Sequence, residues 1–215
     1  KPLSLLSDLV KIGVMENDVI DDQGLREIEA IAAAGGGVSQ VVYAQALSQT
    51  VQMVTRKAMA TTIQGVVNNE LKQILGKSAS IEELPPDKRG EVIEVVDELS
   101  ETSSLEVLVL VDTSASMKHK LPTVKESLID LSISLNARVG KNKFSVFIFP
   151  GKKDDVEKLL DWTPKLESLS KVFSKLSPRG ITPTGPAISE AIRYFSKKRS
   201  LRSLLSDDEQ YYKES

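Results

Sequence analysis

The sequence predicts an α/β protein, a three-layer sandwich in which helices flank a mostly parallel central sheet. First, Leu105–Asp112 is an apolar, β-branched run, which is typical of a parallel strand covered on both faces. Second, short apolar runs alternate along the chain with longer segments whose apolar residues recur at helical spacing. The chain has 215 residues, 40 % of them hydrophobic, so one medium domain or two small ones could form a core.

The N-terminal part predicts two short strands between helices. Three glycines follow the helix predicted to end at Ala34. They could form a phosphate loop, but no Lys-Ser/Thr pair follows them, so we expect a helix end and a turn. The predicted elements are a helix end at Pro2–Lys11, an apolar run at Ile12–Met15, a helix at Gln23–Ala34, a strand at Val38–Tyr43 and a long helix at Ala46–Leu75.

The junction near Lys11 joins a helix to a strand with almost no turn residues, which is unusual even for short connections. The first residue is Lys1, not Met. We therefore expect the natural chain to carry further residues before Lys1, and residues to be missing near Lys11.

The C-terminal part predicts more helices and strands, and a glycine-containing loop. A polar connector at Lys77–Asp87 contains two prolines, which cannot continue a helix. The later predicted elements are helices at Lys88–Leu99, Pro122–Val139, Lys165–Leu176 and Ala187–Lys198, a strand at Phe144–Phe149 and a loop at Pro178–Pro186.

A polar cluster directly follows the central apolar strand. Asp112, Ser114 and Ser116 stand at alternate positions, so they can point into one concavity as the chain leaves the strand. Ligands of open α/β sheets bind outside the carboxyl ends of the strands. One carboxylate and two hydroxyls, without Cys or His nearby, favour Mg²⁺, Mn²⁺ or Ca²⁺ over zinc. The alternative is a structural cap of the following helix, which would account for one hydroxyl but not for the whole set.

The segment Asp112-Thr-Ser114-Ala-Ser116-Met resembles the metal-ion-dependent adhesion site (MIDAS) of von Willebrand factor A (VWA) domains. That family also has a threonine on a later glycine-containing loop, and Thr182 matches it in Gly-Ile-Thr-Pro-Thr-Gly. The resemblance implies Mg²⁺ held by Asp112, Ser114, Ser116 and Thr182. It also implies one coordination position left open for an Asp or Glu carboxylate of a protein partner, while Thr184 would at most contact the ligands.

The N-terminal part resembles the closing third of a VWA domain, so the two parts occur in reversed order. The resemblance therefore implies a circularly permuted domain, whose original termini would have to lie close together. Residues 1–57 would supply the closing third, 58–104 a helical connector and 105–215 the first half with the metal motif. The alternative is a domain-swapped homodimer of incomplete domains. Placement of Val41–Tyr43 and Val107–Val111 in different sheets of the same chain would overturn the permutation.

The third VWA motif, a strand ending in Thr-Asp-Gly, is absent after the helix predicted at Ala187–Lys198. In the family this strand would lie beside Val107–Val111 and bring a second carboxylate to the ion. One carboxylate and three hydroxyls bind Mg²⁺ weakly, because Mg²⁺ dehydrates reluctantly. Without the second carboxylate we expect a site that is empty or filled with water.

Composition excludes several function classes. The net charge of −2 gives no indication of nucleic-acid binding, and the absence of Cys excludes disulfides and thiolate metal sites. No apolar run approaches the ~20 residues of a membrane span, and no signal peptide is visible. His119, the single histidine, is interpreted as a surface residue rather than part of a catalytic triad.

These observations predict a non-enzymatic protein-interaction module. A resemblance over nearly the whole chain to proteins of spore-forming bacteria implies a cytoplasmic protein linked to sporulation. The alternatives are a metal-dependent hydrolase or phosphatase, and a scaffold with a vestigial metal site. Dehalogenase-type phosphatases need a second Asp two residues after the nucleophile, where this chain has Ser114, and a hydroxyl is a poor general acid or base.

Overall fold

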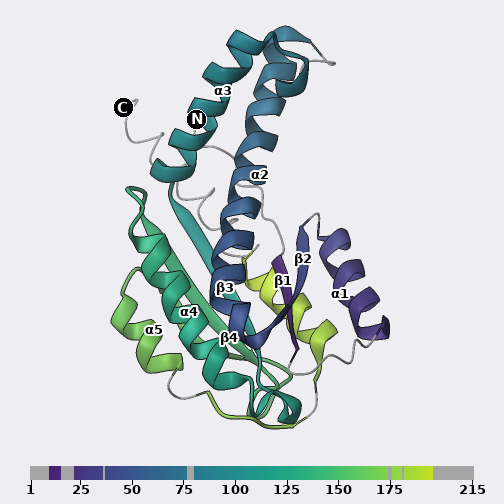
Figure 1. The fold of residues 1–215 in the computed structure, drawn as a ribbon. Coiled ribbons are helices and arrows are strands. Elements are labelled where there is room, and N and C mark those ends of the chain that lie inside the picture. The colour runs from purple at the N-terminus through teal and green to yellow at the C-terminus, as the bar shows by residue number, and fades with distance from the viewer. Residues whose placement is uncertain are drawn as a thin grey trace, which may run out of the picture. The chain divides into compact units, whose positions relative to one another are not determined.

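The computed structural model describes residues 10–15, 22–35, 37–76, 80–173, 176–180 and 182–195. It confirms a mixed α/β protein whose strands are flanked by helices (Figure 1). The chain divides into two compact units. The first is Lys1–Leu105 with Pro122–Lys141, and the second is Glu106–Leu121 with Asn142–Ser215.

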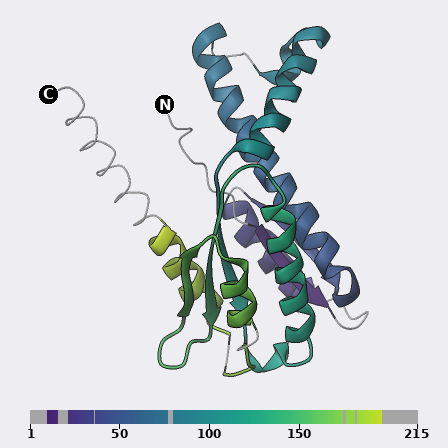
Figure 2. The ribbon, with the colours of Figure 1, turned by 90° about the vertical axis from the view of Figure 1, so that its left-hand side faces the viewer.

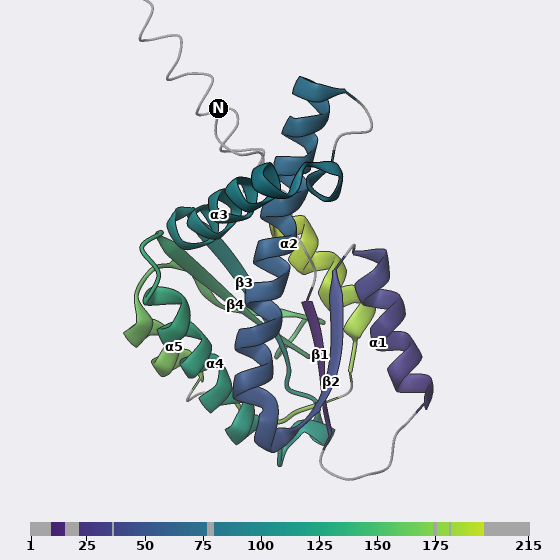
Figure 3. The same cartoon turned by 45° about the horizontal axis from the view of Figure 1, so that its top comes forward.

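The first unit contains a parallel two-stranded sheet of β1 (Val10–Met15) and β2 (Val38–Tyr43), paired from Val10↔Val38 to Met15↔Tyr43. Parallel strands need a crossover connection, and α1 (Asp22–Ala34) supplies it beside the sheet (Figure 3). The glycines end this helix as predicted, because the Gly37 N–H donates to the Ala32 carbonyl at 2.9 Å.

A long helical hairpin forms the rest of the first unit's N-terminal part (Figures 1 and 2). Helix α2 (Leu47–Leu75) packs against α3 (Pro86–Thr102), with η2 (Ile81–Glu83) between them in the chain. The hairpin core consists of buried Ile63, Ile81 and Val96. None of the described helices is long and apolar enough to cross a membrane.

Helix α4 (Leu121–Asn136) lies alongside α2 within the first unit, and two polar contacts join them. The Ser48 hydroxyl donates to Asp130 at 2.6 Å, and Arg56 donates to the Ser134 hydroxyl at 3.0 Å. After α4, the Arg138 guanidinium donates to carbonyl oxygens at the end of α3. It reaches Ser100 from Nε at 2.8 Å and Ser103 from Nη2 at 3.0 Å.

The second unit contains a three-stranded sheet in the order β3 (Leu105–Asp112), β4 (Asn142–Phe149), β5 (Glu157–Thr163). Strands β4 and β5 are antiparallel, with an irregular register around Val146. Strand β4 is almost wholly buried. Helix α5 (Leu166–Phe173) contacts β5, and a helix over residues 184–195 lies beside the strands (Figure 2).

The expectation of one continuous sheet is wrong for the described residues, because β2 and β3 lie in different sheets. This is the outcome stated above as overturning the permutation, so the described strands do not support a permuted single sheet within one chain. The predicted boundary between residues 57 and 58 falls inside α2, which runs without interruption. Strand β5 was not predicted, because Glu157–Thr163 shows no regular alternation of apolar and polar residues.

The other predicted elements agree with the structure apart from their ends. Strand β1 begins at Val10, where the end of a helix was predicted, and the remainder of that predicted helix lies outside the described residues. Helix α4 stops at Asn136, before the predicted end at Val139. The helix predicted at Ala187–Lys198 begins three residues earlier, at 184, and its last three predicted positions also lie outside the described residues.

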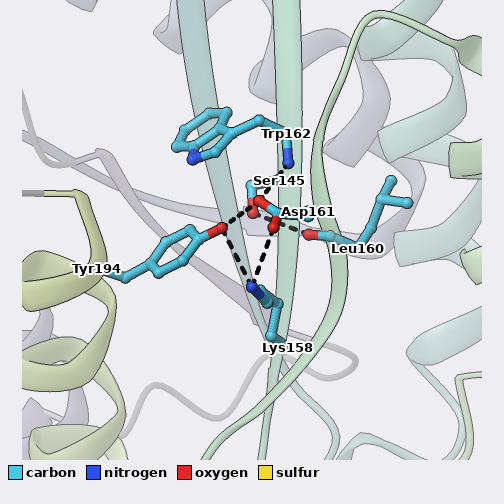
Figure 4. A network of polar contacts seen from close by, with 6 residues as sticks. All are labelled: Ser145, Lys158, Leu160, Asp161, Trp162 and Tyr194. Atoms are coloured by element: carbon cyan, nitrogen blue, oxygen red, sulfur yellow. Dashed lines mark hydrogen bonds and ion pairs between the residues drawn. The ribbon is translucent and has the colours of Figure 1, made fainter. Parts of the chain in front are cut away.

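A polar and aromatic network fixes the helix of residues 184–195 to β5 (Figure 4). The Tyr194 hydroxyl donates to Asp161, and Lys158 Nζ lies 3.2 Å from Asp161 Oδ2 and 3.3 Å from the Tyr194 oxygen. The Tyr194 ring also stacks on the Trp162 ring, with their centroids 6.3 Å apart, and packs against the Phe147 ring, with their centroids 4.9 Å apart. The hydrogen bond from Tyr194 is the main reason that the pKa of Asp161 falls to about 2.

Replacement of Arg138 by Gln tests the link between α3 and the end of α4. We expect the free energy of unfolding to fall by about 2 kcal/mol, because hydrogen bonds from a charged donor to two carbonyl oxygens are lost. Chemical denaturation measures this. Arg193→Gln is the matched control, since its side chain is 77 % exposed and its ion pair with Glu190 should contribute about 0.5 kcal/mol. Equal losses for both variants would contradict the interpretation.

Tyr194→Phe tests the network while keeping the ring. The pKa of Asp161, about 2 in the folded chain, should rise toward its ordinary 3.8, as measured by NMR titration of the carboxyl carbon. Because the folded pKa is depressed, Asp161 stabilises the fold above pH 3.8, and this is lost as the pH falls through about 2. The variant should show a smaller loss of stability in that window.

Lys158→Met should also raise the pKa of Asp161, because the Lys158 hydrogen bond and the Lys158 charge both lower it, each by less than the tyrosine hydrogen bond. A pKa that does not change in Tyr194→Phe would show that the hydroxyl does not donate to this carboxylate.

Candidate metal centre

Strand β3 ends at Asp112, and the chain curls there so that three polar side chains come together. The Asp112 carboxylate accepts a hydrogen bond from the Ser114 N–H at 2.7 Å. The hydroxyls of Ser114 and Ser116 lie 3.0 Å apart, with either one as donor. Ser114 is buried, Asp112 is half-buried and Ser116 is exposed. The alternate spacing therefore does bring one carboxylate and two hydroxyls into one cluster.

Thr113, which is fully buried between two of these residues, connects the cluster to the rest of the unit. Its N–H donates to the Phe149 carbonyl at 2.7 Å, and its hydroxyl donates to the same oxygen at 3.2 Å. Its own carbonyl accepts from the Arg179 N–H at 2.7 Å. One residue thus holds together the loop after β3, the end of β4 and the glycine-containing loop.

Gly180 brings the threonine-bearing loop close to the cluster. Its carbonyl accepts from the Ala115 N–H at 3.3 Å. Its φ is +60°, and a Cβ at this position would lie 2.9 Å from the Pro150 side chain. Both the left-handed backbone and the close approach therefore require glycine here. Thr182 follows two residues later and is exposed.

The structure groups three of the four predicted ligands directly. Among the hydrogen bonds of the described residues, none joins the Thr182 hydroxyl to Asp112, Ser114 or Ser116; the connection runs through backbone bonds of the two loops. The capping alternative has partial support, because the bond from the Ser114 N–H to Asp112 is a local turn bond. The Ser114 side chain, however, makes no capping bond to the short helix after it, η3 (Ala115–Met117).

The donor chemistry fits a hard divalent cation that is held by few anionic ligands. Carboxylate and hydroxyl oxygens are ligands suited to Mg²⁺, Mn²⁺ or Ca²⁺. Within the described part of the chain, no three His, Cys, Asp or Glu side chains gather in a way that could hold a metal ion. Asp112 is thus the one anionic member of the predicted set, which fits weak binding of Mg²⁺.

Charged residues surround the cluster on the neighbouring loops. Glu157 lies 3.7 Å from Lys152 Nζ and 3.6 Å from Arg179, and it accepts from the Lys152 N–H at 3.2 Å. This carboxylate therefore joins the loop after β4 to the glycine-containing loop. His119 is exposed on the loop after β3, as predicted for a surface histidine.

Sequence reasoning missed Thr113, Arg179 and Glu157, which hold the loops in place. Thr113 contributes mainly through its backbone, so its side-chain type gave little indication of this role. Glu157 and Arg179 are 22 residues apart in the numbering, and an ion pair between two such positions leaves no local pattern. The signal that was available is the position of Thr113 between two predicted ligands.

Comparison with known proteins identifies close relatives of unknown function. No model of a known protein family matches the chain. A crystal structure of an uncharacterized protein from Alicyclobacillus acidocaldarius subsp. acidocaldarius DSM 446 is 38 % identical, with a TM-score of 0.78, over 89 % of this chain and 82 % of that one. The uncharacterized protein YabS of Bacillus subtilis (strain 168) is 67 % identical over 203 residues, 94 % of this chain and 83 % of the relative.

Identity at this level over most of both chains shows common ancestry. The chain therefore belongs to the family of the Bacillus subtilis protein YabS.

Proposed function

We propose that this chain is a non-enzymatic, VWA-type protein-interaction module with a MIDAS-like centre. Asp112, Ser114, Ser116 and Thr182 would hold Mg²⁺, and a partner's Asp or Glu would occupy the remaining position. The observation that carries the proposal is the contact between the Ser114 and Ser116 hydroxyls beside Asp112, at the end of an apolar strand. The backbone hydrogen bonds that join Thr113 and Ala115 to Arg179 and Gly180, on the loop before Thr182, support it.

The VWA relationship is proposed for the second unit, which carries the metal motif. The circularly permuted order remains a proposal that requires a further strand, since β2 and β3 lie in separate sheets. Among the described strands, β3 is hydrogen-bonded to β4 alone, although its residues are almost all apolar. A strand pairing with its other edge, and ending in an Asp near Asp112, would supply the second carboxylate.

The proposal also covers the setting of the protein. From the resemblance to proteins of spore-forming bacteria stated in the sequence analysis, we propose a cytoplasmic protein linked to sporulation; the relative from Bacillus subtilis is itself uncharacterized. The partner would be a protein, not a nucleic acid or a membrane. A domain-swapped homodimer remains an alternative way of completing the sheet.

Magnesium titration by calorimetry tests the proposed ligands. We expect weak binding to the full-length protein, and at least about tenfold weaker binding to Asp112→Ala, because this change removes the one carboxylate of the set. Asp154→Ala is the control, since Asp154 is an exposed carboxylate on a neighbouring loop. Equal heats for wild type and Asp112→Ala would mean that Asp112 is not a ligand and that the capping interpretation is correct.

Two experiments separate the proposal from its alternatives. A screen with p-nitrophenyl phosphate should show no turnover, and sustained Mg²⁺-dependent hydrolysis would favour the hydrolase. A pull-down from cell extract with Mg²⁺ or EDTA tests the vestigial scaffold. Our proposal expects EDTA to release at least one partner, whereas capture of every partner without metal would favour the scaffold.

A further inference from the structure

Three loops meet around the candidate centre at one end of the second unit's sheet. Residues 113–120 follow β3, residues 150–156 follow β4, and residues 176–180 precede Thr182. The bonds of Thr113 to Phe149 and Arg179 hold these loops together. A partner that reaches the centre would therefore meet side chains from all three loops.

These loops carry more positive than negative charge. The loops hold two acidic residues, Asp154 and Asp155, and are flanked by Asp112 at the end of β3 and Glu157 at the start of β5. Against these four carboxylates they hold five cations: Lys118, Lys120, Lys152, Lys153 and Arg179. The chain as a whole has a net charge of −2, so this local excess of positive charge contrasts with the rest of the molecule. A bound divalent cation would increase it further.

Two of the five cations, Lys152 and Arg179, already form ion pairs with Glu157. No ion pair within the described part of the chain involves Lys118, Lys120 or Lys153. Lys118 and Lys153 are exposed, and Lys120 is half-buried. We call these three lysines the basic rim. They remain available to carboxylates from outside the chain.

We propose that the basic rim receives additional carboxylates of the same partner that coordinates the metal, so that the partner segment is an acidic stretch of a protein. This inference rests on the proposed metal-dependent function. Charge complementarity around a contact increases the association rate and suppresses wrong partners. Asp154 and Asp155 on the same loop disfavour the continuous phosphate backbone of a nucleic acid, whereas spaced carboxylates can avoid them.

Two hexapeptide probes test the rim on the full-length protein in saturating Mg²⁺. One is Gly-Asp-Gly-Asp-Gly-Asp, and the other keeps the central Asp but has Asn in place of the outer two. We expect wild type to prefer the three-Asp peptide by about tenfold, since each exposed charge pair contributes a few-fold in affinity. The preference should fall to less than about twofold in K118Q/K120Q/K153Q and shrink as salt is added.

K57Q/K72Q/K141Q is the matched control, because it removes the same charge from exposed lysines of the first unit. The control should keep the preference. If K118Q/K120Q/K153Q preferred the three-Asp peptide as strongly as wild type does, the proposed role of the basic rim would be wrong. Tighter binding of a single-stranded oligonucleotide than of the three-Asp peptide would also contradict it. Absence of the preference in wild type, with Mg²⁺-dependent binding intact, would overturn the role of the rim alone. Binding that is the same in EDTA, with the preference intact, would overturn the proposed metal function alone.

Discussion

The candidate centre depends on the hydrogen bonds of one buried residue, Thr113. Its N–H and hydroxyl both donate to the carbonyl at the end of β4, and its carbonyl accepts from Arg179. Buried backbone groups must be paired, so this residue fixes the separation of two strand ends and a loop that is distant in the sequence. Asp112 and Ser114 flank it, and their positions follow from its position. The chemistry of the centre is therefore built on a backbone constraint.

The same arrangement explains why the centre should bind metal weakly. Hydroxyl oxygens carry no charge, and Mg²⁺ exchanges its water for anionic ligands more readily than for neutral ones. With Asp112 as the one carboxylate of the set, much of the ion's charge stays unneutralised. A partner's carboxylate would then gain more from the ion than it would at a site with several anionic ligands. Weak intrinsic binding of metal and dependence on an acidic partner would thus be two consequences of one donor set.

Much of the fold could be predicted from the sequence, because local patterns were strong. The apolar run ending at Asp112 predicted β3, and the glycines after Ala34 predicted the end of α1. Strand β5 was missed because Glu157–Thr163 gains its partners from β4 and from the helix with Tyr194, not from its own pattern. The single sheet was wrong because it was inferred from family order, and no local signal shows which strands pair across a long interval.

Part of the candidate centre could be predicted in the same way. Alternate spacing of Asp112, Ser114 and Ser116 was sufficient to predict their convergence, since residues close in sequence leave the strand together. The approach of the Thr182 loop was suggested by family resemblance, and its physical cause lies in Gly180 and Arg179. Such long-range backbone bonds form only in the assembled sheet, so the spacing of residues in the sequence does not predict them.

A crystal structure of the full-length protein grown with saturating Mn²⁺ tests the central claim most directly, because Mn²⁺ takes the same oxygen ligands as Mg²⁺ and its anomalous scattering locates it. Our account predicts one anomalous peak bonded to Asp112, Ser114, Ser116 and Thr182, with a coordination position open to solvent or to a neighbouring carboxylate. A peak elsewhere, or no peak while Asp112 still accepts only the Ser114 N–H, would contradict it.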